Sequence, residues 1–244
     1  MCEHCLGSPK VLSRRGVLAG AGALLAAGAL PLSHVRAEQK EPGDAPAPNA
    51  IAPSEALERL MQGNERYAAG ECECKDYSVG RAERAEAQYP LAAIVSCSDS
   101  RVSPELLFDQ NPGDVFVVRL AGNIVVDDAF ASLEYAVKFL GAPLIMVLGH
   151  TNCGAVAAAI KVVMERAELP GHLPELIKAI EPAVIAAHGR HPGDLLAVAI
   201  EENVRLSMKR LISDAPIISE ALAGKTVAIS GGVYDIATGK VTLI

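Results

Sequence analysis

The possible folds of this chain are narrowed most by two short apolar runs, each followed at once by polar residues that can bind a metal. The first run, 91–95, leads into residues 96–101 (SCSDSR), and the second, 144–148, leads into residues 149–154 (GHTNCG). Runs of this length and composition are typical of buried strands. Because the carboxyl ends of parallel strands meet at one edge of a sheet, we expect both polar segments to lie at that edge.

Two cysteines and one histidine in these segments, Cys97, Cys153 and His150, can converge on one point. Two thiolates and one imidazole suit Zn²⁺, and three protein ligands leave the fourth tetrahedral position open for water, as a catalytic zinc requires. Cys153 also precedes an Ala/Val-rich helix that we expect to run to about residue 168. The amino end of that helix would favour a thiolate at Cys153.

Strands and helices alternate along the chain. Ser54 is the expected N-cap of the first helix, and the glycines at 231 and 232 are the expected turn before a closing hairpin around residues 238–239. This alternation predicts one α/β domain, residues 54–244, with a central, mostly parallel sheet flanked by helices. The expected helices are 54–67, 81–88, 104–108, 130–140, 153–168, 173–188 and 194–213, and the expected core strands are 91–96, 115–119, 144–148 and 226–230.

Composition limits the partners that this domain can have. Half of the 244 residues are apolar, which is enough for a sizeable core, and tryptophan is absent. The formal net charge of −7 argues against a nucleic acid held through its phosphates, so we expect no nucleic-acid partner.

The first 37 residues are typical of an export signal. Arg14 and Arg15 form a twin arginine, and a Gly/Ala/Leu run from 16 to 32 follows. The pattern resembles a bacterial twin-arginine signal cleaved after Ala37, and an uncleaved amphipathic anchor is the alternative. We therefore expect a periplasmic protein, or a secreted or surface protein if the host has no outer membrane, with no stable membrane anchor after cleavage. The Pro-rich stretch 38–53 is expected to be a disordered linker.

Further segments accompany the two metal-binding motifs in a fixed order. They are 97–101 (CSDSR), 112–114 (PGD), 116–119 (FVVR), 121–123 (AGN), 132–137 (SLEYAV), 149–156 (GHTNCGAV), 234–235 (YD) and 238–239 (TG). Taken together, over about residues 54–244, they resemble the β-class carbonic anhydrases. Leu120 departs from the family pattern, which usually has Asn there.

The resemblance implies reversible, zinc-dependent hydration of CO₂ to bicarbonate by a homodimer or higher even oligomer. It implies one Zn²⁺ per chain, held by Cys97, His150 and Cys153. Asp99 and Arg101 would form the family's Asp-Arg dyad, which orients a zinc-bound hydroxide. Gln88 matches in position the glutamine that helps hold bicarbonate in plant-like members, and it could serve a neighbouring subunit. The absence of Trp predicts that the Trp-containing bicarbonate regulatory pocket of some bacterial members is missing.

Other interpretations of the same residues stay open at this point. In an oxidising compartment Cys97 and Cys153 could form a disulfide. A hydrolase of COS or CS₂ on the same scaffold is one alternative function. A non-catalytic exported zinc-binding protein is another, and it would need Cys72 or Cys74 as a fourth ligand. Asp99 and Arg101 could also be a purely structural ion pair.

Overall fold

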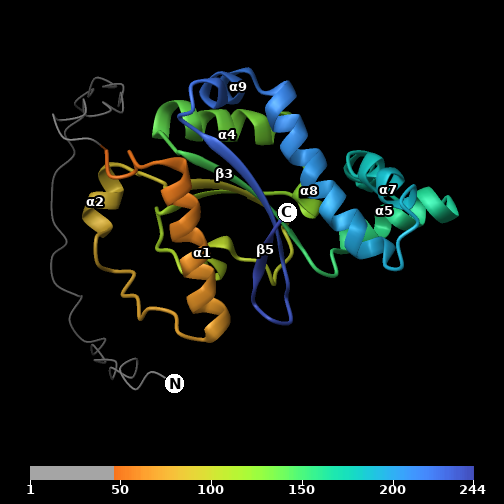
Figure 1. Cartoon of the computed structure of the whole chain (residues 1–244), viewed down its shortest axis with the longest axis horizontal. Coiled ribbons are helices and arrows are strands. Elements are labelled where there is room, and N and C mark those ends of the chain that lie inside the picture. Colours follow the sequence, from red (N-terminus) through yellow and green to blue (C-terminus); the bar gives the residue numbers. More distant parts are fainter. Residues whose placement is uncertain (1–46) are drawn as a thin grey trace, which may run out of the picture. The chain divides into compact units, whose positions relative to one another are not determined.

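The computed structural model describes residues 47–244. The twin-arginine segment and most of the expected linker therefore lie outside the described residues. The described part is organised around one sheet of five strands in the order β2-β1-β3-β4-β5. The strands are β1 (Ala92–Ser96), β2 (Val115–Arg119), β3 (Leu144–His150), β4 (Ala228–Tyr234) and β5 (Val241–Leu243). The first four are parallel and β5 is antiparallel to β4, so the predicted mostly parallel sheet is confirmed (Figure 1).

Helices cover both faces of this sheet. On one face α1 (Pro53–Ala69) and α3 (Pro104–Leu107) pack against Ala92 and Ile94 of β1. On the other, α4 (Asp127–Leu140), α8 (Leu195–Asp214) and α9 (Pro216–Ala223) pack against Ala93 and Val95. Alternate residues of β1 thus enter two different cores, which explains why the strand is apolar throughout.

A third apolar cluster lies beside the carboxyl end of the sheet. It joins α5 (Gly154–Glu165), α6 (Leu173–Lys178) and α7 (Glu181–His188) to the first half of α8. Cys97 and Cys153 belong to the same cluster. The short helix α2 (Arg81–Glu86) contributes no buried residue, and a single 3₁₀ turn, η2 (Ala121–Asn123), follows β2.

The start of the domain differs from the prediction in two ways. Helix α1 begins at Pro53 with Ala52 as its N-cap, so Ser54 does not cap it. Proline suits the first turn because its missing N–H has no partner there in any case. Asn49, expected in the disordered linker, is buried, and its side-chain amide donates to the carbonyls of Pro90 (3.1 Å) and Leu140 (2.7 Å). The ordered domain therefore begins before residue 54.

Two expected elements in the second half of the chain were also wrong. The single helix expected over 173–188 is two helices, α6 and α7, because Pro182 cannot continue a helix begun at Leu173. The expected turn at Gly231 and Gly232 is part of β4, where these residues pair with Val147 and Leu148. Helix α9 follows Ala215 and was not predicted.

Gly231 lies in a strand because helix α8 comes very close to the sheet at that point. A Cβ atom on Gly231 would lie 2.4 Å from the sulfur of Met208 and 2.9 Å from a methyl group of Val204. Glycine in a strand often marks such a close approach instead of a turn. Among the helices within 47–244, none is both long enough and apolar enough to cross a membrane.

Candidate active site

The carboxyl edge of the sheet brings together Cys97, His150 and Cys153. Cys97 follows β1, His150 is the last residue of β3, and Cys153 is the N-cap of α5. One ligand atom from each lies within 4.8 Å of the others, and all three residues are buried. The convergence expected from the two strand ends is therefore present in the structure.

His150 is oriented as a metal ligand would be. Its Nδ1 lies 2.9 Å from the carbonyl oxygen of Thr151, an arrangement that makes Nδ1 the protonated nitrogen and leaves Nε2 with a lone pair. Within the described part of the chain, Nε2 is one of the few buried side-chain nitrogens or oxygens without a hydrogen-bond partner. A buried polar atom without a partner is costly, and a metal ion would remove that cost. Two sulfurs and one such nitrogen fit Zn²⁺.

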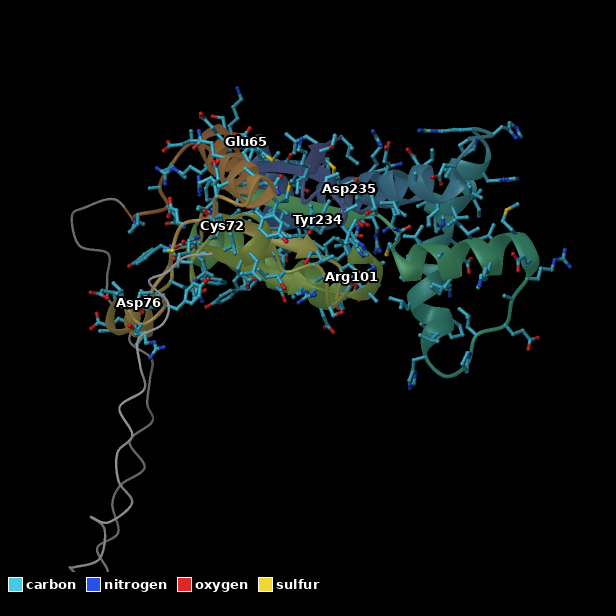
Figure 2. All side chains as sticks on the ribbon, turned by 90° about the horizontal axis from the view of Figure 1, so that it is seen from below. Glu65, Cys72, Asp76, Arg101, Tyr234 and Asp235 are labelled. Carbon is cyan, nitrogen blue, oxygen red and sulfur yellow. The ribbon has the colours of Figure 1, made fainter. Side chains whose placement is uncertain are left out.

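The loop that carries His150 is tied to strand β4. The Thr151 N–H donates to the carbonyl of Tyr234 (2.9 Å), and the Ile236 N–H donates to the Thr151 hydroxyl (3.1 Å). Figure 2 labels Tyr234, which is buried at the end of β4 opposite His150. These bonds fix the direction in which the 150–153 loop leaves the sheet.

Cys97 and Cys153 are not joined by a disulfide, so the disulfide considered from the sequence is absent. A hydrogen bond from Cys153 is the main cause that lowers the pKa of Cys97, and the His150 ring and the Gly122 N–H (3.2 Å from Sγ) lower it further, against the effect of burial. The same bond and burial raise the pKa of Cys153. Binding of one metal ion by both sulfurs requires that both thiols lose their protons.

Asp99 and Arg101 form a close ion pair beside this cluster. The Arg101 guanidinium donates to both carboxylate oxygens, at 2.9 and 2.8 Å, and the Arg101 N–H donates to one of them at 3.0 Å. The bond from Arg101 holds the pKa of Asp99 well below its usual range. Asp99 Oδ2 is 3.9 Å from His150 Nε2. The ionised Asp99 carboxylate therefore lies beside the candidate metal position. Its partner Arg101, labelled in Figure 2, is exposed.

Arg119 is a further residue of the site, and the sequence indicated it only as part of the FVVR segment. Its guanidinium donates to the carbonyls of Cys97 (3.1 Å) and Asp99 (2.7 Å). Arg119 ends β2 and pairs in register with Ser96 of β1, so it lies directly beside the loop that it holds. Arg119 thus fixes the backbone that presents both Cys97 and Asp99.

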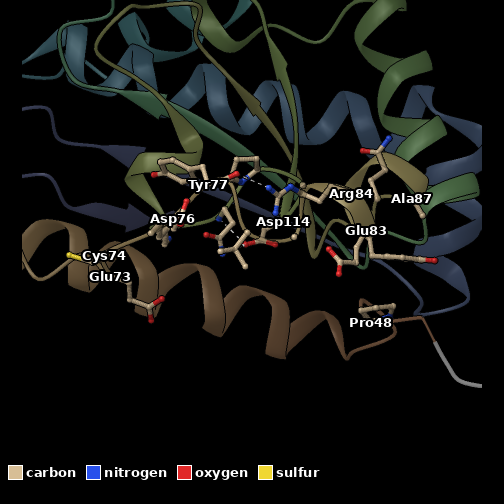
Figure 3. A pocket seen from close by; sticks show the side chains of 17 residues that line it. Pro48, Glu73, Cys74, Asp76, Tyr77, Glu83, Arg84, Ala87 and Asp114 are labelled. Atoms are coloured by element: carbon tan, nitrogen blue, oxygen red, sulfur yellow. Dashed lines mark hydrogen bonds between the residues drawn. The ribbon is translucent and has the colours of Figure 1, made fainter. Parts of the chain in front are cut away.

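Gln88 is not part of this cluster in the same chain. It lines an open hollow with Asn111 and Asp114, near the amino ends of β1 and β2 (Figure 3). The N–H of Leu91, just before β1, donates to the Asp114 carbonyl (2.9 Å), whereas Cys97 follows the opposite end of that strand. Cys72 and Cys74 are exposed, and neither belongs to the three-residue metal cluster found within 47–244. Within this chain, Gln88 thus lies away from the Cys97, His150 and Cys153 cluster.

Comparisons with known proteins agree with this geometry. Residues 92–241 match the family model described as "Carbonic anhydrase". The chain is 38% identical to carbonic anhydrase 2 of Mycobacterium tuberculosis over 193 residues, which cover 78% of this chain and 92% of the relative. It is 37% identical to the carbonic anhydrase of Mycolicibacterium smegmatis, with 78% and 93% covered.

Solved structures extend the agreement to the fold. The β-carbonic anhydrase of Coccomyxa, in complex with acetazolamide, superposes with a TM-score of 0.61 at 29% identity, covering 78% of this chain and 85% of that one. One of two tetrameric β-carbonic anhydrases of Sordaria macrospora gives 0.63 at 25% identity, with 78% and 97% covered. The chain belongs to the carbonic anhydrase family, and its fold is that of the β class. It is an enzyme, and hydration of CO₂ is the activity of its family.

Proposed function

We propose that this protein is a zinc-dependent enzyme that hydrates CO₂ reversibly, with Cys97, His150 and Cys153 as the metal ligands. The observation that carries the proposal is the unpartnered His150 Nε2, buried beside two thiols. These residues would hold a zinc ion, which when bound would lower the pKa of a water molecule and make a hydroxide nucleophile available near neutral pH. Three protein ligands leave one position open for that water.

Asp99 is the proposed hydrogen-bond acceptor for the attacking oxygen. Because Arg101 keeps Asp99 ionised, the carboxylate can accept the O–H of the nucleophile and turn its lone pair toward CO₂. Asp99 Oδ2 lies 3.9 Å from His150 Nε2, and the two bonds from Arg101 would keep Asp99 from turning into the open metal position.

X-ray absorption at the zinc edge of the loaded protein tests the ligand set. We expect two sulfur ligands at about 2.3 Å, one nitrogen at about 2.0–2.1 Å and one further light atom from solvent. A site with three or four sulfur ligands would contradict the proposal, because it would require Cys72 or Cys74 and would leave no open position.

We also propose that the active form is an even homo-oligomer in which Gln88 of the partner subunit reaches the zinc site. Three observations support this. Gln88 lies at the opposite end of β1 from Cys97 in its own chain, and α2, just before it, buries no residue of its own. The similar Sordaria enzymes are described as tetrameric. Each site would then combine ligands from one subunit with a substrate-binding amide from the next.

Export by the twin-arginine route remains a proposal based on Arg14, Arg15 and the apolar run that follows them. Fusing residues 1–37 to a reporter that works only after folded export tests it. We expect export that is lost when both arginines are replaced by lysine. Export that persists in the double variant would contradict the twin-arginine route.

A further inference from the structure

Helix α8 makes a row of hydrogen bonds to the loop that follows β2. Asn203, Ser207 and Arg210 lie on successive turns of the same helix face, and each donates to a backbone carbonyl of that loop. The acceptors are Gly122 (2.7 Å from Asn203 Nδ2), Asn123 (3.1 Å from Ser207 Oγ) and Val125 (2.5 Å from Arg210 Nη1). Asn203 and Ser207 are only 1% and 3% exposed. Two buried polar side chains of α8 thus hold the backbone of this loop in place.

Gly122 connects this row to the candidate metal site. Its carbonyl accepts the bond from Asn203, and its own N–H donates to Cys97 Sγ at 3.2 Å. Gly122 has φ +72°, and a Cβ atom there would lie 2.6 Å from Ile180. A bulkier residue would therefore displace the loop from α7 or turn the N–H away from the sulfur. The position of this N–H depends on where the Gly122 backbone is held.

A backbone N–H that donates a hydrogen bond to a metal-binding sulfur changes the properties of that ligand. It takes up part of the thiolate charge and fixes the direction of the sulfur lone pairs, and such outer partners commonly matter for metal affinity. Ser207 offers a direct comparison. It makes the same kind of buried bond one turn further along α8, but its acceptor is the carbonyl of Asn123, whose N–H donates to the Leu120 carbonyl instead of to a sulfur.

We propose that Asn203 is a positioning residue for the metal ligand Cys97, because it holds Gly122 where its N–H meets the sulfur. The inference rests on the proposed function in one respect, namely that Cys97 binds the metal. It assigns to α8, a helix that contributes no ligand, an effect on the electronic state of the metal site through the Gly122 N–H.

The test compares Asn203→Leu with the matched control Ser207→Ala in the purified protein. Three quantities are measured for each: the thermal midpoint, the zinc dissociation constant from competition with a chromophoric chelator, and the sulfur-to-cobalt charge-transfer band after Co²⁺ substitution. For Asn203→Leu we expect about tenfold weaker zinc binding and a shifted charge-transfer band. For Ser207→Ala we expect a lower midpoint with an unchanged band. Asn203→Ala serves if the leucine variant does not fold.

The possible outcomes separate this inference from the proposed function. A wild-type protein that binds neither metal overturns the proposed function and the inference with it. A wild-type protein that binds both, with an Asn203 variant of unchanged affinity and unchanged band, overturns the inference alone. So does a band shift of equal size in Ser207→Ala, because the effect would then follow general loosening of the loop.

Discussion

His150 illustrates how single residues acquire a role from their surroundings. Its Nδ1 is engaged by Thr151, and its Nε2 adjoins the two thiols and the Asp99 carboxylate. These ligand types were predictable, because both motifs directly follow apolar strands whose ends must meet. The supporting residues were not. Asn203 bonds to Gly122 across 81 positions of sequence, and no local pattern indicates such a contact.

Asp99 allows metal binding to be separated from turnover. The Asp99→Ala variant is expected to keep zinc, since no ligand is removed, and to lose hydration activity by about 10²-fold or more, the range typical for loss of a positioned proton acceptor. Zinc content and CO₂ hydration measured on the same sample check this. Full activity in the variant would mean that the carboxylate is only the structural partner of Arg101.

At the scale of elements, the errors of prediction have two different origins. Gly231 and Gly232 resembled a turn because their sequence does not reveal that α8 packs tightly over β4. The break between α6 and α7, by contrast, was signalled by Pro182 and could have been predicted. Strands β1 and β3 were found because their apolar runs are short and uninterrupted, as is typical of strands buried on both faces.

Gly231→Ala tests the close packing of α8 on β4. The added methyl group must displace Met208 or Val204, and overpacking of this kind costs about 1–3 kcal/mol of unfolding free energy. Denaturant unfolding gives the value, and Gly154→Ala is a suitable control because a Cβ there meets nothing within 4 Å. Equal stability of the Gly231 variant and wild type would show that the helix can move away freely.

A buried ion cluster ties the segment after α1 to the end of α3. Asp109, with a side chain 3% exposed, lies 2.7 Å from both Lys75 Nζ and Arg66 Nε. Burial alone would raise the pKa of Asp109, but the bonds from Lys75 and Arg66 outweigh it and lower the pKa. A carboxyl group whose pKa is lower in the folded state stabilises the fold above its unfolded pKa of about 4. That contribution is lost as the pH falls through the folded-state pKa.

The Asp109→Asn substitution is therefore expected to lower the free energy of unfolding by an amount that depends on pH. Breaking a buried ion pair costs about 3–5 kcal/mol near pH 7, and the difference from wild type should shrink as the pH falls below about 4. Urea unfolding over that pH range measures it. Glu86→Gln, which changes an exposed carboxylate, should have little effect at any pH. A constant difference across the range would contradict the role of the Asp109 charge.

At the scale of the whole molecule, the sequence predicted that Gln88 serves a zinc site. It did not indicate whether that site lies in the same subunit or in a neighbouring one. The distinction depends on the direction of β1, which separates Gln88 from Cys97 within one chain. The family resemblance covers this position only by spacing, and spacing does not distinguish contacts within a chain from contacts between chains.

Mixed oligomers test the shared site. Gln88→Ala and Asp99→Ala chains are each expected to be weakly active alone. When both chains are present in one dimer, one of its two sites combines an intact Asp99 with an intact Gln88 of the partner subunit. Activity should then rise well above the mean of the two parents, and co-expression with two affinity tags isolates the mixed species. A mixed dimer no more active than that mean would contradict a site shared between subunits.

Stopped-flow measurement of CO₂ hydration, with zinc determined in the same sample, decides whether the Cys97–His150–Cys153 cluster is the catalytic centre. We predict hydration that rises in proportion to zinc content up to about one ion per chain and disappears when a chelator removes the metal. If the protein is fully loaded with zinc but hydrates no CO₂ at any pH between about 6 and 9, CO₂ hydration is not its activity. That result would favour COS or CS₂ as the substrate. Hydration that persists without zinc would contradict the metal site itself.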